Sequence, residues 1–76
     1  MTQITYYKSE DCDNCKAMRP IINKLRREGH DIKVVDLDTE YTSTTIRYVP
    51  TTVICKEGKC KRVIGAISEK RLRNLL

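Results

Sequence analysis

Long apolar runs are missing from this chain of 76 residues: no uninterrupted hydrophobic stretch reaches even ten residues. A membrane-spanning helix needs about 20 consecutive apolar residues, so the sequence predicts none. The N-terminal segment also lacks a basic region followed by an apolar stretch, which argues against a secretory signal peptide. We therefore expect a cytosolic protein, with cytoplasmic localisation and no membrane partner.

Internal repeats, low-complexity tracts and flexible linkers are absent as well. A chain of 8.8 kDa cannot enclose a second hydrophobic core, because even one core of this size is marginally stable. With 39% hydrophobic and 33% charged residues, the composition is that of a globular chain and not of a disordered one. We expect residues 1–76 to form one domain and the protein to be a monomer.

The positive charge is unevenly distributed along the chain. The net charge is +5, and residues 56–76 carry all of it, with seven basic and two acidic side chains. Such a segment can attract an acidic protein or a nucleic acid. A solvated edge strand and a solvated helix face explain it more simply, so nucleic acid is not expected as a partner.

The first half of the chain predicts a strand followed by an amphipathic helix. Residues 4–7 are β-prone, and Asp11 is then a plausible N-cap. Gly29 ends the helix, and Pro20 bends it because proline removes one backbone hydrogen bond. One apolar stripe at helical spacing comprises Met18, Ile21, Ile22 and Leu25.

The second half predicts three more strands and a final helix. The strands cover residues 32–37, 51–55 and 60–64, with a tight turn at Glu57-Gly58 between the last two. Residues 39–47 are rich in threonine and predict a short helix or a turn. Ser68 is the expected N-cap of the last helix, which buries Leu72. The order β-α-β-α-β-β-α predicts an α/β fold, a four-stranded mixed sheet flanked by helices.

Two cysteines in a C-x-x-C motif carry the chemistry. Cys12 and Cys15 follow the first strand and open the amphipathic helix, a pattern typical of redox proteins. Unpaired amides and the helix dipole lower the pKa of a thiol in the first turn, and the thiolate is the nucleophile. Cys15, three residues further on, can attack a mixed disulfide at Cys12 and release the product. The predicted activity is protein disulfide oxidoreduction, with Cys12 and Cys15 as the catalytic residues.

Charged neighbours modulate this pair. A carboxylate at Asp13 opposes formation of the Cys12 thiolate, whereas Lys8 and Lys16 offset that effect. We hypothesise that Asp13 makes the pair more reducing than a neutral residue would.

Three segments resemble the thioredoxin/glutaredoxin superfamily, and together they extend over nearly the whole chain. Cys15-Lys-Ala-Met-Arg-Pro-Ile-Ile22 resembles the segment that follows the second active-site cysteine of thioredoxins, including its bending proline. Tyr48-Val-Pro-Thr-Thr52 resembles the loop with a cis-proline that faces the cysteines, and Val63-Ile-Gly-Ala-Ile-Ser68 resembles the closing strand and helix entry. The resemblance implies a single thioredoxin-like domain of glutaredoxin size over residues 1–76.

This resemblance also implies a substrate site and partners. Pro50 would be cis, and the backbone of Val49 would form hydrogen bonds with a bound substrate chain. The substrates would be proteins that contain disulfides. The reductant would be either a flavoprotein of the thioredoxin reductase type or glutathione, and no cofactor is needed.

Departures from the family pattern affect the choice of reductant. Asp11 stands in place of the tryptophan of thioredoxins, and the buried acid that thioredoxins have on the preceding strand is missing. Gly65-Ala66 and Ser68 replace the Gly-Gly and the acid with which glutaredoxins hold glutathione. The replaced glutathione-binding residues favour a flavoprotein reductase over glutathione, whereas the missing acid leaves open what assists proton transfer at Cys15.

A second pair of cysteines flanks the predicted turn. Cys55 and Cys60 would face each other as a non-hydrogen-bonded pair, with Cα atoms about 4.5 Å apart, which allows a cross-strand disulfide. A reducing cytosol favours two free thiols instead. The sequence leaves the bridge, the free thiols and a metal role open.

Two functions of other kinds remain as alternatives. A small zinc module would use Cys12, Cys15, Cys55 and Cys60 as ligands, with the basic C-terminal part binding nucleic acid. A redox sensor would bind its partner in only one oxidation state. The long apolar stripe and the Pro50 loop fit a redox fold better than a zinc module, so no metal site is predicted.

Overall fold

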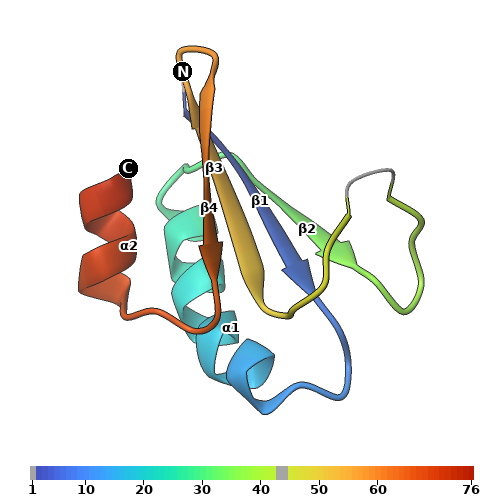
Figure 1. The fold of residues 1–76 in the computed structure, drawn as a ribbon. Helices are drawn as coiled ribbons and strands as arrows, with labels where there is room; N and C mark the ends of the chain where they lie inside the picture. The colour runs from blue at the N-terminus through green and yellow to red at the C-terminus, as the bar shows by residue number, and fades with distance from the viewer. Residues whose placement is uncertain (1, 43–44) are drawn as a thin grey trace.

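The computed structural model describes residues 2–42 and 45–76, which form one β-sheet with two α-helices (Figure 1). The elements in chain order are β1 (Thr2–Lys8), α1 (Asp13–Arg27), β2 (Ile32–Asp36), β3 (Thr51–Lys56), β4 (Lys59–Ile64) and α2 (Glu69–Leu75). The four strands and the two long helices that the sequence predicts are thus present, with small differences at their ends.

The sheet is mixed, as predicted. Its strand order is β2-β1-β3-β4, with β1 parallel to β2, while β1–β3 and β3–β4 are antiparallel. The two central strands, β1 and β3, therefore run in opposite directions. The end of β1 and the start of β3 consequently meet at one end of the sheet, and α1 begins at that same end (Figure 1).

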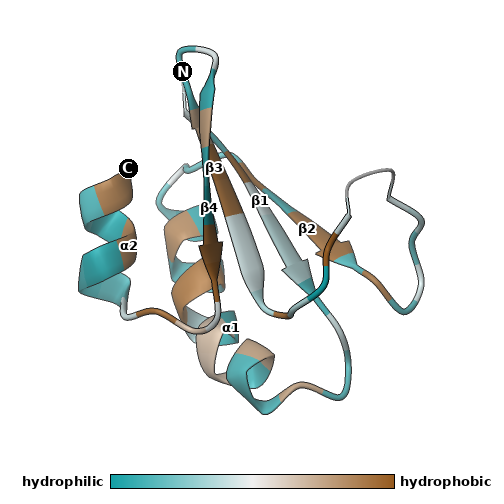
Figure 2. Cartoon of the chain, in the orientation of Figure 1, coloured by the Kyte–Doolittle hydropathy of each residue, from teal (hydrophilic) through white to brown (hydrophobic). Residues whose placement is uncertain are grey.

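The core lies between one face of the sheet and both helices. Alternate residues along a strand point to the same face, so Ile4, Tyr6 and Ile54 all face the helices. Figure 2 shows that the hydrophobic sides of α1 and α2 are turned inward. The buried cluster consists of Ile4, Tyr6, Met18, Ile22, Leu25, Ile32, Ile54 and Leu72. In the described chain, no helix is both long enough and apolar enough to cross a membrane.

Local signals end the elements where the sequence predicts. Gly29 follows α1 with a φ of 101°, a left-handed conformation that glycine adopts without steric cost. Glu57 and Gly58 both have positive φ, as a two-residue hairpin turn requires, and Lys56 pairs with Lys59. The hydroxyl of Ser68 accepts a hydrogen bond from the amide of Arg71 at 3.2 Å and caps α2.

An ion-pair cluster joins the two helices at the surface. The Arg73 guanidinium donates to both carboxylate oxygens of Glu28 at 2.9 and 2.7 Å, and its Nε donates to Glu69 at 2.9 Å. Lys24 also donates to Glu69, at 3.2 Å. The hydrogen bonds from Arg73 hold the pKa values of Glu28 and Glu69 below the usual range for glutamate.

The lowered pKa values predict how stability depends on pH. A carboxylate whose pKa is lower in the folded state stabilises the fold above its unfolded pKa of about 4.3, and this stabilisation is lost as the pH falls through the folded value. We expect Arg73→Gln to be less stable than the wild type at pH 7 and equally stable near pH 2, measured by urea unfolding at both values. Arg71→Gln is the matched control, because Arg71 is exposed. A stability difference between wild type and Arg73→Gln that persists at pH 2 would contradict this prediction.

The connection between β2 and β3 begins with a turn, in which the Asp36 carbonyl accepts from the amides of Thr39 and Glu40 at 3.1 and 2.8 Å, and not with the helix of the predicted order β-α-β-α-β-β-α. Residues 39–42 and 45–47 form no helix, and residues 43 and 44 lie outside the described part. Threonine has low helix propensity because its branched side chain loses rotamer freedom in a helix, and threonine is frequent here. The two helices that do form share one face of the sheet. The connection lies near the other face, where Arg62 of β4 donates to the Thr45 carbonyl at 3.2 Å.

Candidate active site

Cys12 forms the N-cap of α1. Its backbone is extended, with φ −143° and ψ 106°, and its Sγ accepts a hydrogen bond from the amide of Cys15 at 3.1 Å. The predicted N-cap, Asp11, is therefore wrong by one residue, because the sulfur of Cys12 takes the capping role. A sulfur at this position faces the unpaired amides of the first turn, where a negative charge is stabilised.

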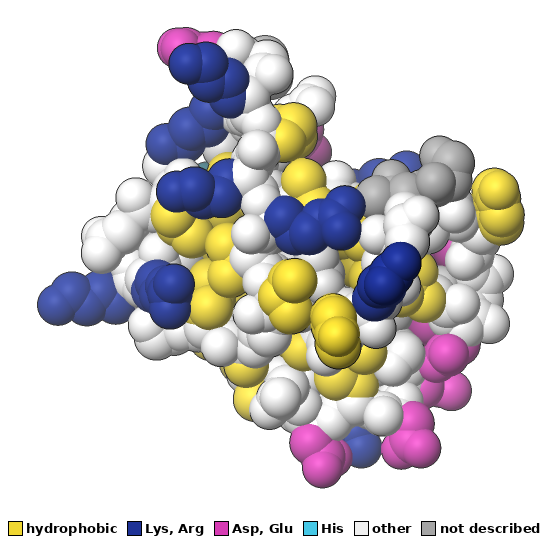
Figure 3. All heavy atoms as spheres, in the orientation of Figure 1, with side chains coloured by type: hydrophobic (Ala, Val, Ile, Leu, Met, Phe, Trp, Pro, Cys, Tyr) yellow, Lys and Arg dark blue, Asp and Glu magenta, His cyan; other side chains and the backbone are white. Residues whose placement is uncertain are grey.

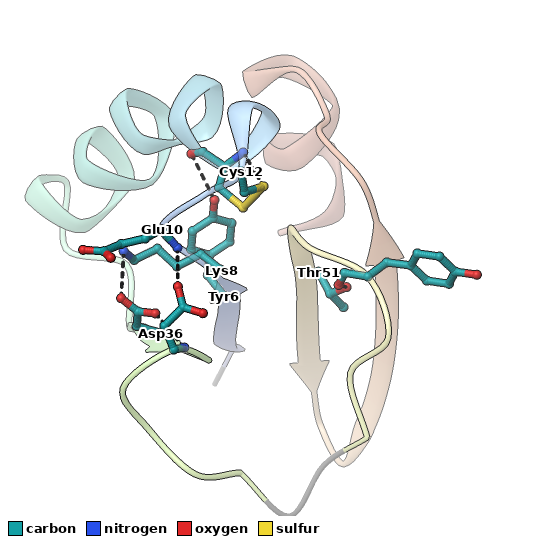
Figure 4. The surroundings of a disulfide bond; sticks show 9 residues. Tyr6, Lys8, Glu10, Cys12, Asp36 and Thr51 are labelled. Atoms are coloured by element: carbon teal, nitrogen blue, oxygen red, sulfur yellow. Dashed lines mark hydrogen bonds and ion pairs between the residues drawn. A yellow bond between two sulfur atoms is a disulfide. The ribbon is translucent and has the colours of Figure 1, made fainter.

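Cys12 and Cys15 are joined by a disulfide, with their Cα atoms 5.2 Å apart (Figure 4). Cys15 is 4% exposed, whereas Cys12 is half-buried. A molecule from solution therefore reaches the sulfur of Cys12 more easily than that of Cys15.

Tyr6 supports the first turn of α1 from below. Its hydroxyl donates to the backbone carbonyl of Cys15 at 3.3 Å, and the side chain is 2% exposed (Figure 4). Burial raises the pKa of Tyr6, and the positive charge of Arg19 acts in the opposite direction. Nothing near Tyr6 in the sequence indicates this role, and only the fold shows that Tyr6 holds this turn.

Acidic side chains at the end of β2 fix the loop that leads into Cys12. The Asp38 carboxylate accepts from the amide of Glu10 at 2.7 Å, and the amide of Asp38 donates to Asp36 at 3.0 Å. Lys8, predicted to act on the pKa of Cys12, forms an ion pair with Asp36 at 3.4 Å. Lys16, the other predicted modulator, is exposed on α1.

A cavity of about 180 Å³ adjoins Cys15 on the side that faces β2. Its lining includes Tyr6, Lys8, Glu10, Cys15 and Arg19. The cavity thus brings together Cys15, a phenol and five charged side chains, since Lys16 and Arg26 also line it. It offers polar groups next to Cys15, although the acid that thioredoxins bury there is absent from this sequence.

The Val49–Pro50 peptide bond is cis, in agreement with the resemblance. Pro50 is buried and Val49 is half-buried, and the Pro50 carbonyl accepts from the amide of Gly65 at 2.8 Å. The hydroxyl of Thr51 donates to the Tyr48 carbonyl and closes the loop. The loop precedes β3 directly, so it lies at the end of the sheet where α1 begins (Figure 1).

The second cysteine pair also forms a disulfide. Cys55 and Cys60 are register partners in the β3–β4 hairpin, with Cα atoms 4.0 Å apart. The structure has a disulfide here and not the two free thiols that a reducing cytosol would favour. The hairpin register brings the two side chains face to face on one side of the sheet.

The geometry is incompatible with the zinc module. Cys12 and Cys15 lie where α1 begins, and the hairpin that carries Cys55 and Cys60 projects from the opposite end of the sheet (Figure 1). Within residues 2–42 and 45–76, no three His, Cys, Asp or Glu side chains are grouped so that they could hold a metal ion. The proposed set of four cysteine ligands is therefore wrong.

The family model described as Thioredoxin matches residues 2–76, almost the entire sequence. The chain belongs to the thioredoxin family. The thioredoxin-like fold that the sequence predicts is thereby confirmed. Family membership and the Cys12–Cys15 pair together support the activity of a thiol–disulfide oxidoreductase.

Solved structures of thioredoxins show the same fold. A mutant thioredoxin from Halobacterium salinarum NRC-1 is 22% identical, with a TM-score of 0.84 over 97% of this chain and 70% of its own. Thioredoxin-2 of the malaria parasite is 20% identical, with a TM-score of 0.85 over 99% of this chain and 80% of its own. A further malarial protein is 20% identical, with a TM-score of 0.86 over 99% of this chain and 92% of its own. No curated protein matches the sequence.

Asp13 stands in the first turn of α1, next to Cys12. Removing its negative charge stabilises the thiolate and therefore the reduced form of the pair. We expect Asp13→Asn to raise the reduction potential by about 10–20 mV, measured by equilibration with a dithiol buffer. Asp31→Asn, which neutralises an exposed acid beyond the other end of α1, should leave the potential unchanged. A lower or equal potential in Asp13→Asn would refute the hypothesis.

Proposed function

We propose that this protein reduces disulfides in other proteins, with Cys12 as the attacking thiol and Cys15 as the resolving thiol. The observation that carries the proposal is the difference in exposure within one helical turn. Cys12 is partly open to solvent at the N-cap, and Cys15 is almost fully buried behind it.

In the first step, the thiolate of Cys12 attacks one sulfur of the substrate disulfide. A bond forms between Cys12 Sγ and that sulfur, the substrate S–S bond breaks, and the other substrate sulfur leaves as a thiolate that takes a proton from solvent. The amides of the first turn stabilise the charge on Cys12 before the attack, and the amide of Cys15 is the nearest donor.

In the second step, Cys15 loses its proton and attacks Sγ of Cys12. The Cys12–Cys15 disulfide forms, and the second substrate sulfur leaves as a thiolate, so two electrons have passed to the substrate. Tyr6 holds the backbone of Cys15 in place for this attack. The reaction needs no metal and no bound cofactor, because both electrons come from the two thiols.

The loop before β3 is the proposed substrate platform. The backbone of Val49 would form hydrogen bonds with an extended segment of the substrate, as the family resemblance implies. Pro50 is the buried residue of this loop, and its carbonyl accepts a hydrogen bond from the amide of Gly65, so it would fix the orientation of that backbone.

We further propose a flavoprotein reductase of the thioredoxin reductase type as the electron donor, in preference to glutathione. Ala66 and Ser68 stand where the resemblance places glutathione-binding residues of glutaredoxins. The protein would act as a monomer in the cytoplasm, where such a reductase would keep it reduced.

Insulin disulfide reduction tests the function and the donor together. The wild-type protein should reduce insulin with NADPH and a thioredoxin reductase, and more slowly with glutathione and glutathione reductase. No reduction with either donor, nor after prior reduction with dithiothreitol, would contradict the proposed function. Faster turnover with glutathione would contradict only the choice of donor.

A further inference from the structure

The β3–β4 hairpin carries a disulfide that the proposed reaction does not use. Cys60 lies on β4, which is an edge strand of the sheet, and it is exposed, whereas Cys55 on β3 is half-buried. A thiolate can therefore approach the sulfur of Cys60 from solvent. Exposed disulfides are commonly the labile ones in proteins.

The surroundings of this disulfide are positively charged. Residues 56–62 carry four cations and one acid, which gives a net charge of +3. The cations are Lys56, Lys59, Lys61 and Arg62, and the acid is Glu57. Positive charges stabilise thiolates and therefore the reduced form of a cysteine pair, which makes its disulfide the better electron acceptor.

The surroundings of Cys12 have the opposite sign. Residues 8–16 and 36–40 are tied together by the Lys8–Asp36 ion pair and by the Glu10–Asp38 hydrogen bond, and they carry six acids and two bases, net −4. When Arg19 and Arg47 are counted as well, the net charge is −2. Figure 3 shows acidic side chains toward the end where α1 begins and β2 ends, and basic ones over the hairpin and α2.

The two disulfides cannot react within one folded molecule. Pro50 lies at the end of the sheet where α1 and Cys12 begin, and Cys55 stands five residues further along an extended strand. This places Cys55 about 16 Å away from that end. The hairpin end and the Cys12 end of the molecule are opposite in sign, so two copies can associate with the hairpin of one against the active site of the other.

We propose that the Cys55–Cys60 disulfide is a second redox couple, which accepts electrons from the reduced Cys12–Cys15 pair of another copy of this protein. The inference rests on the proposed function of Cys12 and Cys15. Such a transfer makes the redox state of Cys55–Cys60 follow the redox state of Cys12–Cys15 across the population of molecules.

The exchange balances with no further reactant. The Cys12 thiolate of the donor attacks Sγ of Cys60 in the acceptor, the Cys55–Cys60 bond breaks, and Cys55 leaves as a thiolate and takes a proton from solvent. Cys15 of the donor then loses a proton and attacks Cys12, and Cys60 leaves as a thiolate and is protonated. The donor ends oxidised and the acceptor reduced by two electrons.

Two variants separate the couples. The donor, Cys55→Ser/Cys60→Ser, retains only the active-site pair, and the acceptor, Cys12→Ser/Cys15→Ser, retains only the hairpin pair. Reduced ¹⁵N-labelled donor is mixed with oxidised acceptor, quenched in acid, alkylated and weighed by mass spectrometry. The acceptor should gain two alkyl groups as the donor loses two, and the rate should fall about tenfold from low to high salt.

Charge reversal tests the docking. Lys59→Glu/Lys61→Glu in the acceptor should slow the transfer about tenfold at low salt. Lys70→Glu/Arg71→Glu, the same change on exposed residues of α2, should slow it much less. Equal slowing by the two pairs would overturn the docking at the hairpin.

The remaining outcomes distinguish the two proposals. A donor that reduces insulin but not the acceptor, while dithiothreitol reduces the acceptor, would overturn this inference and leave the proposed function intact. Resistance of the acceptor to dithiothreitol would also overturn it. Net transfer from reduced acceptor to oxidised donor would overturn the direction. A donor inactive toward insulin would contradict the proposed function itself.

Discussion

Cys12→Ser should abolish insulin reduction, with a loss of at least about 100-fold under conditions in which the wild type is active. Serine caps the helix as well as cysteine does, because its hydroxyl can accept the hydrogen bond from the amide of Cys15. The substitution therefore removes the nucleophile and keeps the fold. A hydroxyl at this position has a pKa far above 7 and cannot form a stable bond to a substrate sulfur, so no slower route replaces the lost one.

The matched control is Cys55→Ser/Cys60→Ser, which removes the other disulfide of the chain. This double variant should retain the rate of insulin reduction, because the hairpin lies at the other end of the sheet (Figure 1). Urea unfolding of both variants confirms that they are folded. A Cys12→Ser protein that still reduces insulin at the wild-type rate would exclude Cys12 as the nucleophile.

Leu72→Ala should cost about 2–5 kcal/mol of unfolding free energy. Leu72 is 0% exposed and is the only fully buried residue of α2 among those the structure describes. A domain of this size has only about 4–11 kcal/mol in total, so the loss is a large fraction of its stability. The cost combines the lost transfer free energy of the side chain with the cavity left between α2, α1 and the sheet.

Urea unfolding measures this loss, with Ile64→Ala as control. Ile64 is 58% exposed, so its truncation should change the free energy of unfolding by no more than about 0.5 kcal/mol. Leu72→Ala should shift the unfolding midpoint to lower urea by about 2 M, given the shallow urea dependence of small domains. Equal midpoints for the two variants would show that α2 does not contribute to the core as the structure indicates.

Local sequence signals predict most of the fold. The apolar spacing of Met18, Ile22 and Leu25 gives α1 its buried side, and the structure confirms it. Glu57-Gly58 and Ser68 mark the hairpin turn and the helix N-cap correctly, because each acts through bonds within a few residues. Such signals do not depend on the rest of the chain.

The features that the sequence leaves undetermined are those that depend on packing. The threonine-rich connection between β2 and β3 has no strong local preference, so its path is set by contacts such as that between Thr45 and Arg62. The placement of α1 and α2 on one face follows from the burial of Leu25 and Leu72 in one cluster with Ile4 and Ile54, which no single segment encodes.

In the candidate site, too, local features can be predicted from the sequence and features that depend on packing cannot. The spacing of Cys12 and Cys15 is visible in the sequence, and so is the reactive position at a helix start. The roles of Tyr6 and Asp38 are not visible, because Asp38 contacts Glu10 across 28 residues and Tyr6 reaches α1 from a neighbouring strand. The ion pair between Lys8 and Asp36 is not visible either, because Asp36 approaches Lys8 only once β1 and β2 pair.

The most direct test of the account is to trap the mixed disulfide. The Cys15→Ser variant, reduced and mixed with an insulin or peptide disulfide, should accumulate a covalent adduct because the resolving thiol is absent. Peptide mapping by mass spectrometry should place the substrate on Cys12. An adduct on Cys55 or Cys60 alone, or no adduct while the wild type reduces the same substrate, would contradict the claim that Cys12 attacks and Cys15 resolves.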